Sequence, residues 1–187
     1  MQQHVIRRAT HAERGLDLYE TPGVAVEALL RVEKIPQLVW EPAAGKGAII
    51  RVLRDHGHAV IASDIYDYGG LDFVGDFLAQ ERMPAGCDCI LTNPPFMLIE
   101  RFIARALELA PHVIMLARLA LLESERRRPI LEGCGLARVH VFRKRLPMLH
   151  RDGWEGRKAN SGMASAWFCW NREHVGPTII NRISWER

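Results

Sequence analysis

The sequence is poor in the features that mark secreted, membrane and metal-binding proteins. Among its 187 residues no apolar run approaches the roughly 18 residues that cross a membrane. Residues 1–14 lack the apolar centre of a signal peptide. There are only four cysteines and no Cys-x-x-Cys pair, which argues against a disulfide scaffold. We therefore expect a cytoplasmic protein without a metal site or membrane contact.

Lysine is scarce as well. Only four of the 25 basic residues are lysines, and the net charge is no more than +3. Arginine binds phosphate as a planar fork and stacks on bases, but a GC-rich genome would produce the same bias. The position of the arginines is therefore more informative than their number.

Two common nucleotide-binding signatures are absent from the first glycine-rich turn. The segment Glu41–Gly47 follows a predicted strand, Gln37–Trp40, and precedes a predicted helix that ends near His56. It is neither a phosphate loop ending in Gly-Lys-Ser/Thr nor a Gly-x-Gly-x-x-Gly turn. Its glycines allow the backbone to approach a ligand closely. Its acid would repel a pyrophosphate and would suit an ammonium or sulfonium group.

An acid ends the second predicted strand. His58–Ser63 has the composition of a strand, and Asp64 follows it at a distance of 64 − 41 = 23 positions from Glu41. An acid about 20 residues beyond such a turn commonly binds ribose hydroxyls. The alternative role of Asp64 is that of a turn former, but the spacing favours a ribose.

Two adjacent prolines end a third apolar segment. Cys89–Thr92 is predicted to be a buried strand, and neither Pro94 nor Pro95 can donate to a strand ladder. The chain therefore leaves the sheet at Asn93, at the edge where ligands bind in open α/β sheets. An amide beside the ring of Phe96 suits a planar ring with an exocyclic amine. A proline-rich turn without function is the alternative.

The rest of the chain predicts a doubly wound α/β sheet with an antiparallel strand near one edge. Helices are expected after Thr21, an N-cap, and at Met97–Ala110 and Leu119–Glu132. The last of these carries Arg126-Arg127-Arg128, which we interpret as a solvated face rather than a nucleic-acid patch. Further strands are expected at 112–117, 136–142, 164–170 and 178–185, with 136–142 and 164–170 antiparallel to each other.

One long irregular stretch, 143–162, joins the antiparallel pair. Long loops inside compact domains are usually functional or disordered. This one mixes cations with an aromatic ring, as loops that hold a phosphate backbone and stack on bases do. An irregular surface hairpin is the alternative. The predicted nucleic-acid-binding residues are Arg143, Arg145, Arg151, Trp154, Arg157 and Lys158.

The tetrapeptide Asn93-Pro94-Pro95-Phe96 resembles the catalytic motif of class I S-adenosylmethionine-dependent amino-methyltransferases of the N6-adenine type, in a small form without a target-recognition domain. This resemblance implies a doubly wound, mostly parallel, seven-stranded Rossmann-like sheet, S-adenosylmethionine as cofactor, and catalysis by these four residues. It extends in order to the Tyr-x-Thr-Pro segment, the glycine turn and two acids. The implied cofactor-binding residues are Tyr19, Thr21, Pro22, Glu41, Pro42, Ala43, Gly45, Gly47, Asp64, Ile65, Asp76, Phe77 and Asn93.

The resemblance also implies individual roles for these residues. Thr21 would lie at the methionine end of the cofactor, and Ile65 would pack on its adenine. Asp76 would recognise the amino group of that adenine, with Phe77 beside the ring. Residues 1–14 are expected to form a flexible arm, and residues 15–187 a single methyltransferase domain.

The expected reaction is methyl transfer to N6 of adenine in DNA. Methylation of adenine in RNA uses the same tetrapeptide and stays an alternative. A second alternative is methylation of a protein glutamine amide, although that family usually has Tyr at the position of Phe96. A catalytically silent cofactor-binding subunit is a third. The absence of a Pro-Cys pair argues against C5 methylation of cytosine. The oligomeric state stays open.

Overall fold

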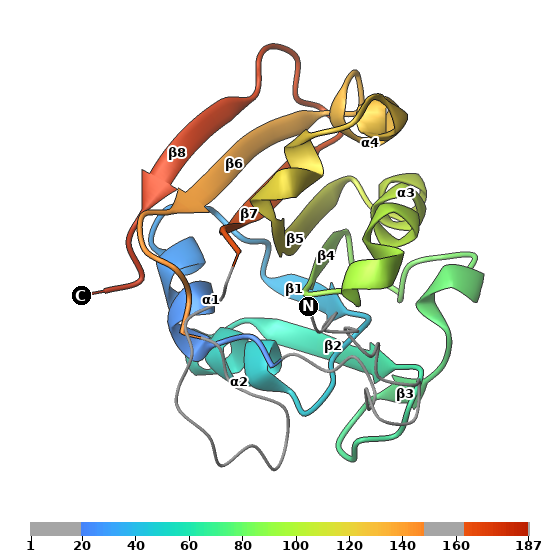
Figure 1. The fold of residues 1–187 in the computed structure, drawn as a ribbon. Helices are drawn as coiled ribbons and strands as arrows, with labels where there is room; N and C mark the ends of the chain where they lie inside the picture. The colour runs from blue at the N-terminus through green and yellow to red at the C-terminus, as the bar shows by residue number, and fades with distance from the viewer. Residues whose placement is uncertain (1–19, 148–162, 187) are drawn as a thin grey trace, which may run out of the picture.

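Eight strands form one sheet at the centre of the computed structural model, which describes residues 20–147 and 163–186 (Figure 1). Their order is β3-β2-β1-β4-β5-β7-β6-β8, and only the pairings of β7 with β5 and β6 are antiparallel. The strands are β1 Leu38–Glu41, β2 Ala59–Asp64, β3 Phe73–Val74, β4 Cys89–Thr92, β5 His112–Arg118, β6 Leu136–Phe142, β7 Ser165–Asn171 and β8 Ile179–Ile183.

The predicted doubly wound sheet with an antiparallel strand near one edge is confirmed. The sheet has eight strands rather than the seven that the resemblance implied, because β8 pairs in parallel with β6 and forms one edge. The predicted antiparallel pairing of the last long strands is also confirmed, with Val139 opposite Phe168.

Helices cover both faces of the sheet. The helices are α1 Gly23–Leu30, α2 Ala48–Asp55, α3 Ile99–Leu109 and α4 Arg128–Leu131, with 3-10 turns η1 Phe77–Ala79, η2 Phe96–Leu98, η3 Leu119–Leu122 and η4 Glu125–Arg127. One core cluster lies between the sheet and α1 and α2, and the second lies between the sheet and α3 and α4. Within the part of the chain that the structure describes, no helix is long and apolar enough to cross a membrane.

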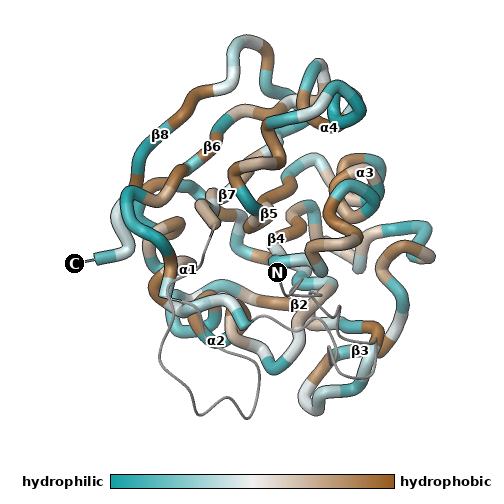
Figure 2. Tube along the Cα trace, viewed as in Figure 1, coloured by the Kyte–Doolittle hydropathy of each residue, from teal (hydrophilic) through white to brown (hydrophobic). Residues whose placement is uncertain are grey.

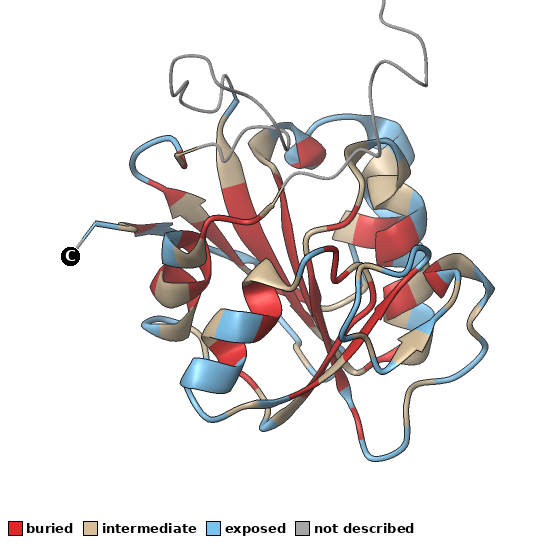
Figure 3. Cartoon of the chain, turned by 90° about the horizontal axis from the view of Figure 1, so that it is seen from below, coloured by how far each residue is buried: buried red, intermediate tan, exposed pale blue. Residues whose placement is uncertain are grey.

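The alternation of side chains along the strands supplies both clusters. In β7, Trp167 and Cys169 belong to the cluster under α1 and α2, whereas Phe168 and Trp170 belong to the one under α3. Strands buried on both faces are continuously apolar, as Figure 2 shows for the centre of the sheet. Figure 3 shows the same strands as the most deeply buried part of the molecule.

The prediction that Thr21 caps the first helix is wrong. Helix α1 begins at Gly23, Pro22 is the capping residue, and no described side chain caps the helix. Thr21 is instead buried, with 3% of its surface exposed. The proline carbonyl accepts the N–H of Ala25 at 2.8 Å, so the backbone satisfies this orphan donor of the first turn.

The single helix predicted over Leu119–Glu132 is also wrong. The segment forms two 3-10 turns and the short α4, and Ser124 between the turns has a left-handed φ of 84°. Pro129 has no N–H to donate within a continuous helix, and it lies instead in the first turn of α4, where that N–H is not needed.

Candidate functional site

Four polar residues end four neighbouring strands of the sheet. Glu41 is the last residue of β1, Asp64 of β2, Thr92 of β4 and Arg118 of β5. These strands are mutually parallel and adjacent in the order β2-β1-β4-β5. Their carboxyl ends therefore meet at one edge, where open α/β sheets bind ligands.

The glycine turn is fastened to the end of β2 by Asp64. The Oδ2 atom of Asp64 accepts the N–H of Gly45 at 2.9 Å, and Oδ1 accepts the N–H of Tyr66 at 3.1 Å. Only 8% of Asp64 is exposed. Gly45 and Gly47 have left-handed φ values of 50° and 79°, which glycine adopts without steric cost. The glycine turn and Asp64, which lie apart in the sequence, thus form one cluster of loops.

Glu41 is a buried carboxyl group beside that cluster. Its exposed fraction is 1%, and Oε1 accepts the N–H of Ala43 at 3.2 Å. Burial raises its pKa to about 8; the Thr92 hydroxyl and the Ala43 N–H lower the pKa, and the charge of Asp64 raises it further. The Thr92 hydroxyl faces this carboxyl, yet among the described residues neither Thr92 Oγ1 nor Glu41 Oε2 makes a hydrogen bond of normal geometry. Orphaned buried oxygens are costly and suggest a role for a ligand.

The Asn93–Phe96 segment leaves β4 beside the same edge. Pro94 is buried, Asn93, Pro95 and Phe96 are half-buried, and η2 begins at Phe96. The predicted exit of the chain from the sheet at Asn93 is therefore correct. The guanidinium carbon of Arg118 lies 4.3 Å from the centre of the Phe96 ring.

Arg118 and Thr92 were not singled out from the sequence. Thr92 and Arg118 each end a mostly apolar strand, and the chain changes direction after each of them. The rule that polar residues at strand ends line ligand sites could have found both of them.

The remaining implied cofactor residues have different surroundings. Ile65 follows Asp64 and is 55% exposed. Asp76 is exposed and accepts the N–H of Leu78 at 2.9 Å, the arrangement of a turn former. Phe77 is 3% exposed, with its ring 5.3 Å from Trp40 and 4.8 Å from Phe102, so it belongs to the core. Of the others, Thr21, Pro22 and Pro42 are buried, Ala43 is half-buried, and Tyr19 lies outside the described residues.

The predicted nucleic-acid residues are described only in part. Arg143 and Arg145 are exposed, and within the described ranges their side chains make no ion pair. Lys144 between them pairs with Glu186 at 2.7 Å. Arg151, Trp154, Arg157 and Lys158, like the arm at 1–14, lie outside the described residues.

The cations of η4 and α4 are engaged within the protein. Arg126 and Arg127 each lie 2.8 Å from Glu100, and Arg128 lies 3.1 Å from Glu132. Arg126 and Arg128 are exposed, as expected of a solvated face, whereas Arg127 is half-buried.

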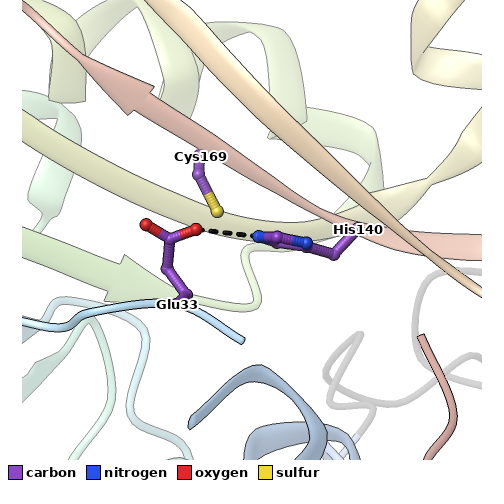
Figure 4. A group of neighbouring side chains, drawn as sticks. All are labelled: Glu33, His140 and Cys169. Carbon is purple, nitrogen blue, oxygen red and sulfur yellow. Dashed lines mark hydrogen bonds and ion pairs between the residues drawn. The ribbon is translucent and has the colours of Figure 1, made fainter. Parts of the chain in front are cut away.

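A second polar cluster lies under α1. The ligand atoms of Glu33, His140 and Cys169 lie within 4.8 Å of one another (Figure 4). Both oxygens of Glu33 accept donors of Arg138, at 2.5 and 2.7 Å, and one also contacts His140 Nε2 at 2.8 Å. Burial would raise the pKa of Glu33, but the bonds from His140 and Arg138 prevail and lower it to about 2.

This cluster has the bonding of a structural network. Burial raises the pKa of Cys169 well above its usual value, so it stays a thiol, and a metal would have to displace Arg138 from Glu33. The network instead joins the turn after α1 to β6 across 105 residues of sequence. Trp167 of β7 also holds α1 against the sheet, because its indole N–H donates to the Ala25 carbonyl at 2.9 Å.

Comparison with known proteins gives matches in structure alone. No protein-family profile and no curated sequence matches the chain. A modification subunit of a candidate type I restriction enzyme from Vibrio vulnificus superposes with a TM-score of 0.62 at 15% identity, covering 88% of this chain and 47% of that one. The chain therefore spans about half the length of that subunit.

Two further solved structures cover similar parts of the chain. A candidate RNA methyltransferase from Pyrococcus horikoshii has a TM-score of 0.60 at 19% identity and covers 82% of this chain and 86% of that one. A candidate class I S-adenosylmethionine-dependent methyltransferase from Listeria monocytogenes has a TM-score of 0.55 at 12% identity and covers 88% and 64%. The chain thus has the Rossmann-like fold of the class I methyltransferases.

Proposed function

We propose that this protein is an S-adenosylmethionine-dependent methyltransferase that methylates the exocyclic N6 of adenine in DNA. The observation that supports this most is the exit of Asn93–Phe96 from β4 at the sheet edge that also carries Asp64 and Glu41. A segment suited to an amine on a planar ring lies at the same edge as a candidate ribose acceptor.

The residues at this edge fit the cofactor. Asp64 would accept hydrogen bonds from ribose hydroxyls, and the exposed side chain of Ile65 would cover the adenine. Glu41 Oε2, buried without a hydrogen-bond partner among the described residues, would serve a cationic part of the ligand. Thr21 and Pro22 at the start of α1 would lie toward the methionine end, and Asp76 toward the adenine amino group. When bound, the cofactor would supply an electrophilic methyl group on sulfur.

The protein's contribution to the reaction would be to position and polarise the amine. The N6 lone pair of adenine is delocalised into the ring and is a poor nucleophile. The side-chain oxygen of Asn93 and the carbonyl of Pro94 would each accept one N–H, which draws the nitrogen toward a tetrahedral form. Phe96 would hold the base by stacking. Such preorganised acceptors act by orientation and electrostatics and require no strong base.

The target base must be accessible to this segment. In a duplex it has to be flipped out, at a cost of a few kcal/mol, whereas single strands present it directly. Adenine in RNA is the second candidate, since one solved structure with this fold is described as a candidate RNA methyltransferase. The restriction-modification subunit and the exposed Arg143 and Arg145 are compatible with DNA.

The test is methyl transfer from labelled cofactor to separate pools of DNA, RNA and protein, with nucleoside mass spectrometry of the products. We expect N6-methyladenine in DNA. Asn93→Ala should lower the single-turnover rate by roughly 10²–10³ while the cofactor still binds, because it removes one preorganised acceptor. Asn171→Ala is the matched control, since Asn171 ends β7 and its side chain, among the described residues, accepts only the N–H of Glu173 at 2.9 Å.

Phe96 provides a second readout of the same site. Phe96→Ala should weaken binding of the target base by about 1–3 kcal/mol, the usual value of stacking. Phe96→Tyr should weaken this binding only slightly. N6-methyladenine found only in the RNA pool would mean that RNA, and not DNA, is the substrate. Transfer at full rate in Asn93→Ala would show that another segment is the active site, and cofactor binding without transfer to any pool would indicate a silent subunit.

A further inference from the structure

Arg118 is held in a fixed position over the aromatic ring of the proposed catalytic segment. It is the last residue of β5, three positions beyond Met115, which pairs with the last residue of β4, Thr92. Arg118 also pairs with Ser165 of β7, and the following N–H, of Leu119, donates to the Ala164 carbonyl at 2.8 Å. The backbone at Arg118 is thus held by β7, and the guanidinium carbon lies 4.3 Å from the centre of the Phe96 ring.

The donors of this guanidinium are not used by the described residues. Arg118 is half-buried, yet within 20–147 and 163–186 its side chain makes no ion pair and no hydrogen bond. Other half-buried arginines in the same ranges are engaged: Arg138 binds Glu33, and Arg127 binds Glu100. A planar cation that lies on an aromatic face keeps its edge donors available to a second group.

The chemistry of that second group follows from the position of the donors. A guanidinium is a fork that matches a phosphate and forms two parallel charge-assisted hydrogen bonds with it. In a nucleic acid, a phosphate lies next to every base, so a base stacked at Phe96 would bring one to the neighbouring cation. A neutral amide substrate on a protein would leave this charge without a counterpart.

We propose that Arg118 is a positioning residue that binds the phosphate flanking the target adenine and fixes the plane of Phe96. This rests on the proposed function and deepens it, because it specifies a nucleotide within a strand as the substrate. Cation and ring would then hold one nucleotide at two points, its phosphate and its base.

The experiment compares two changes to the same contact. Oligonucleotides with one target adenine, chosen from the products of the pool experiment, carry either the natural flanking phosphate or a neutral methylphosphonate. For wild type we expect the neutral linkage to lower kcat/KM by roughly tenfold or more, the usual effect of one charge-assisted hydrogen bond. On the natural strand, Arg118→Ala should lower kcat/KM by the same factor, chiefly by raising KM. On the neutral strand the substitution should lower kcat/KM little further.

Controls separate this contact from folding and from general charge. Affinity for S-adenosylhomocysteine should be unchanged in Arg118→Ala, and Arg118→Lys should recover part of the loss only on the natural strand, since it keeps the charge without the planar fork. Arg128→Ala removes an exposed arginine that already pairs with Glu132 at 3.1 Å and should behave as wild type.

Three outcomes would overturn the inference. Additive effects of Arg118→Ala and the neutral linkage would mean that the arginine only supports Phe96. Equal activity of Arg118→Ala and wild type would mean that Arg118 has no role in the reaction. If Arg118→Ala also lowers cofactor affinity, the test depends on Arg118→Lys. An equal kcat/KM of Arg118→Lys on the natural and the neutral strand would then overturn the phosphate contact. A wild-type protein that methylates no nucleic acid would instead contradict the proposed function.

Discussion

The carboxylate of Asp64 accepts a hydrogen bond of 2.9 Å from the N–H of Gly45. This bond joins the end of β2 to the glycine turn after β1, and the Ala44 N–H reinforces it by donating to the Ser63 carbonyl at 3.0 Å. A carboxylate has lone pairs beyond those used by Gly45 and Tyr66. Asp64 can therefore shape the turn and still accept bonds from a ligand.

Asp64→Ala should weaken binding of S-adenosylhomocysteine, since it removes the proposed ribose acceptor. The expected loss is about 1.5–3 kcal/mol, the value of hydrogen bonds to a charged group, measured by calorimetric titration. Asp67→Ala is the control, because Asp67 is exposed on the same loop and, within the described part of the chain, its side chain accepts only the N–H of Gly69 at 2.8 Å. Unchanged affinity in Asp64→Ala would remove this residue from the cofactor site.

Glu41 should make the ligand-free protein less stable as pH rises. Burial raises its pKa from 4.5 to about 8, so between these values the folded protein binds more protons than the unfolded chain. The contribution of this carboxyl is fully present below about pH 4.5 and is lost as pH rises through about 8. Its slope is at most about 1.4 kcal/mol per pH unit.

Glu41→Gln should remove that dependence. Urea unfolding at several pH values between 5 and 9 would show the variant gaining stability relative to wild type as pH rises. The exposed Glu81→Gln serves as the control and should follow wild type. If the difference between Glu41→Gln and wild type does not change with pH, Glu41 is not a buried acid in solution.

Glu33 should have the opposite pH dependence. The bonds from His140 and Arg138 overcome burial and lower its pKa from 4.5 to about 2, so its stabilisation is present above about pH 4.5 and is lost as pH falls toward 2. Without solvent screening the shift corresponds to roughly 3 kcal/mol, which is an upper limit on the stabilisation. Glu33→Gln should lower the unfolding free energy at pH 7 by an amount of this order and by less near pH 3.

The exposed pair of Glu27 and His56, 3.3 Å apart, gives the matched comparison for the buried network. Glu27→Gln should change the unfolding free energy by no more than about 1 kcal/mol, as is usual for surface pairs. Equal effects of the two substitutions at pH 7 would mean that the Glu33 network does not fasten α1 to the sheet.

Arg143 and Arg145 should contribute to nucleic-acid affinity through phosphates. The double substitution to Ala should reduce the slope of log affinity against log salt by as much as about 0.9 for each phosphate of duplex DNA that is no longer neutralised. Lys144→Ala is an adjacent control, because Lys144 already pairs with Glu186 at 2.7 Å. Fluorescence anisotropy at several salt concentrations makes the measurement, and identical slopes for the double variant and wild type would exclude the two arginines from the interface.

Local chain chemistry determined the turns that the sequence predicted correctly. Two consecutive prolines after an apolar run force the chain out of the sheet at Asn93, and the glycines of the Glu41–Gly47 turn permit the left-handed geometry that is observed. Strand ends follow from runs of apolar residues. These features depend on neighbours in sequence, and they fixed both the fold class and the edge where the candidate residues gather.

Contacts between distant parts of the chain decided the rest. The apolar surroundings of Phe77 place it in the core beside Trp40 and Phe102, a packing that its sequence position beside Asp76 does not reveal. The sequence distances between Arg118 and Phe96, or Arg138 and Glu33, contain no signal for their pairing. The raised pKa of Glu41 likewise reflects desolvation by everything packed around it. Sterics and backbone preferences act locally, whereas burial, charge pairing and stacking exist only once the sheet has brought remote residues together.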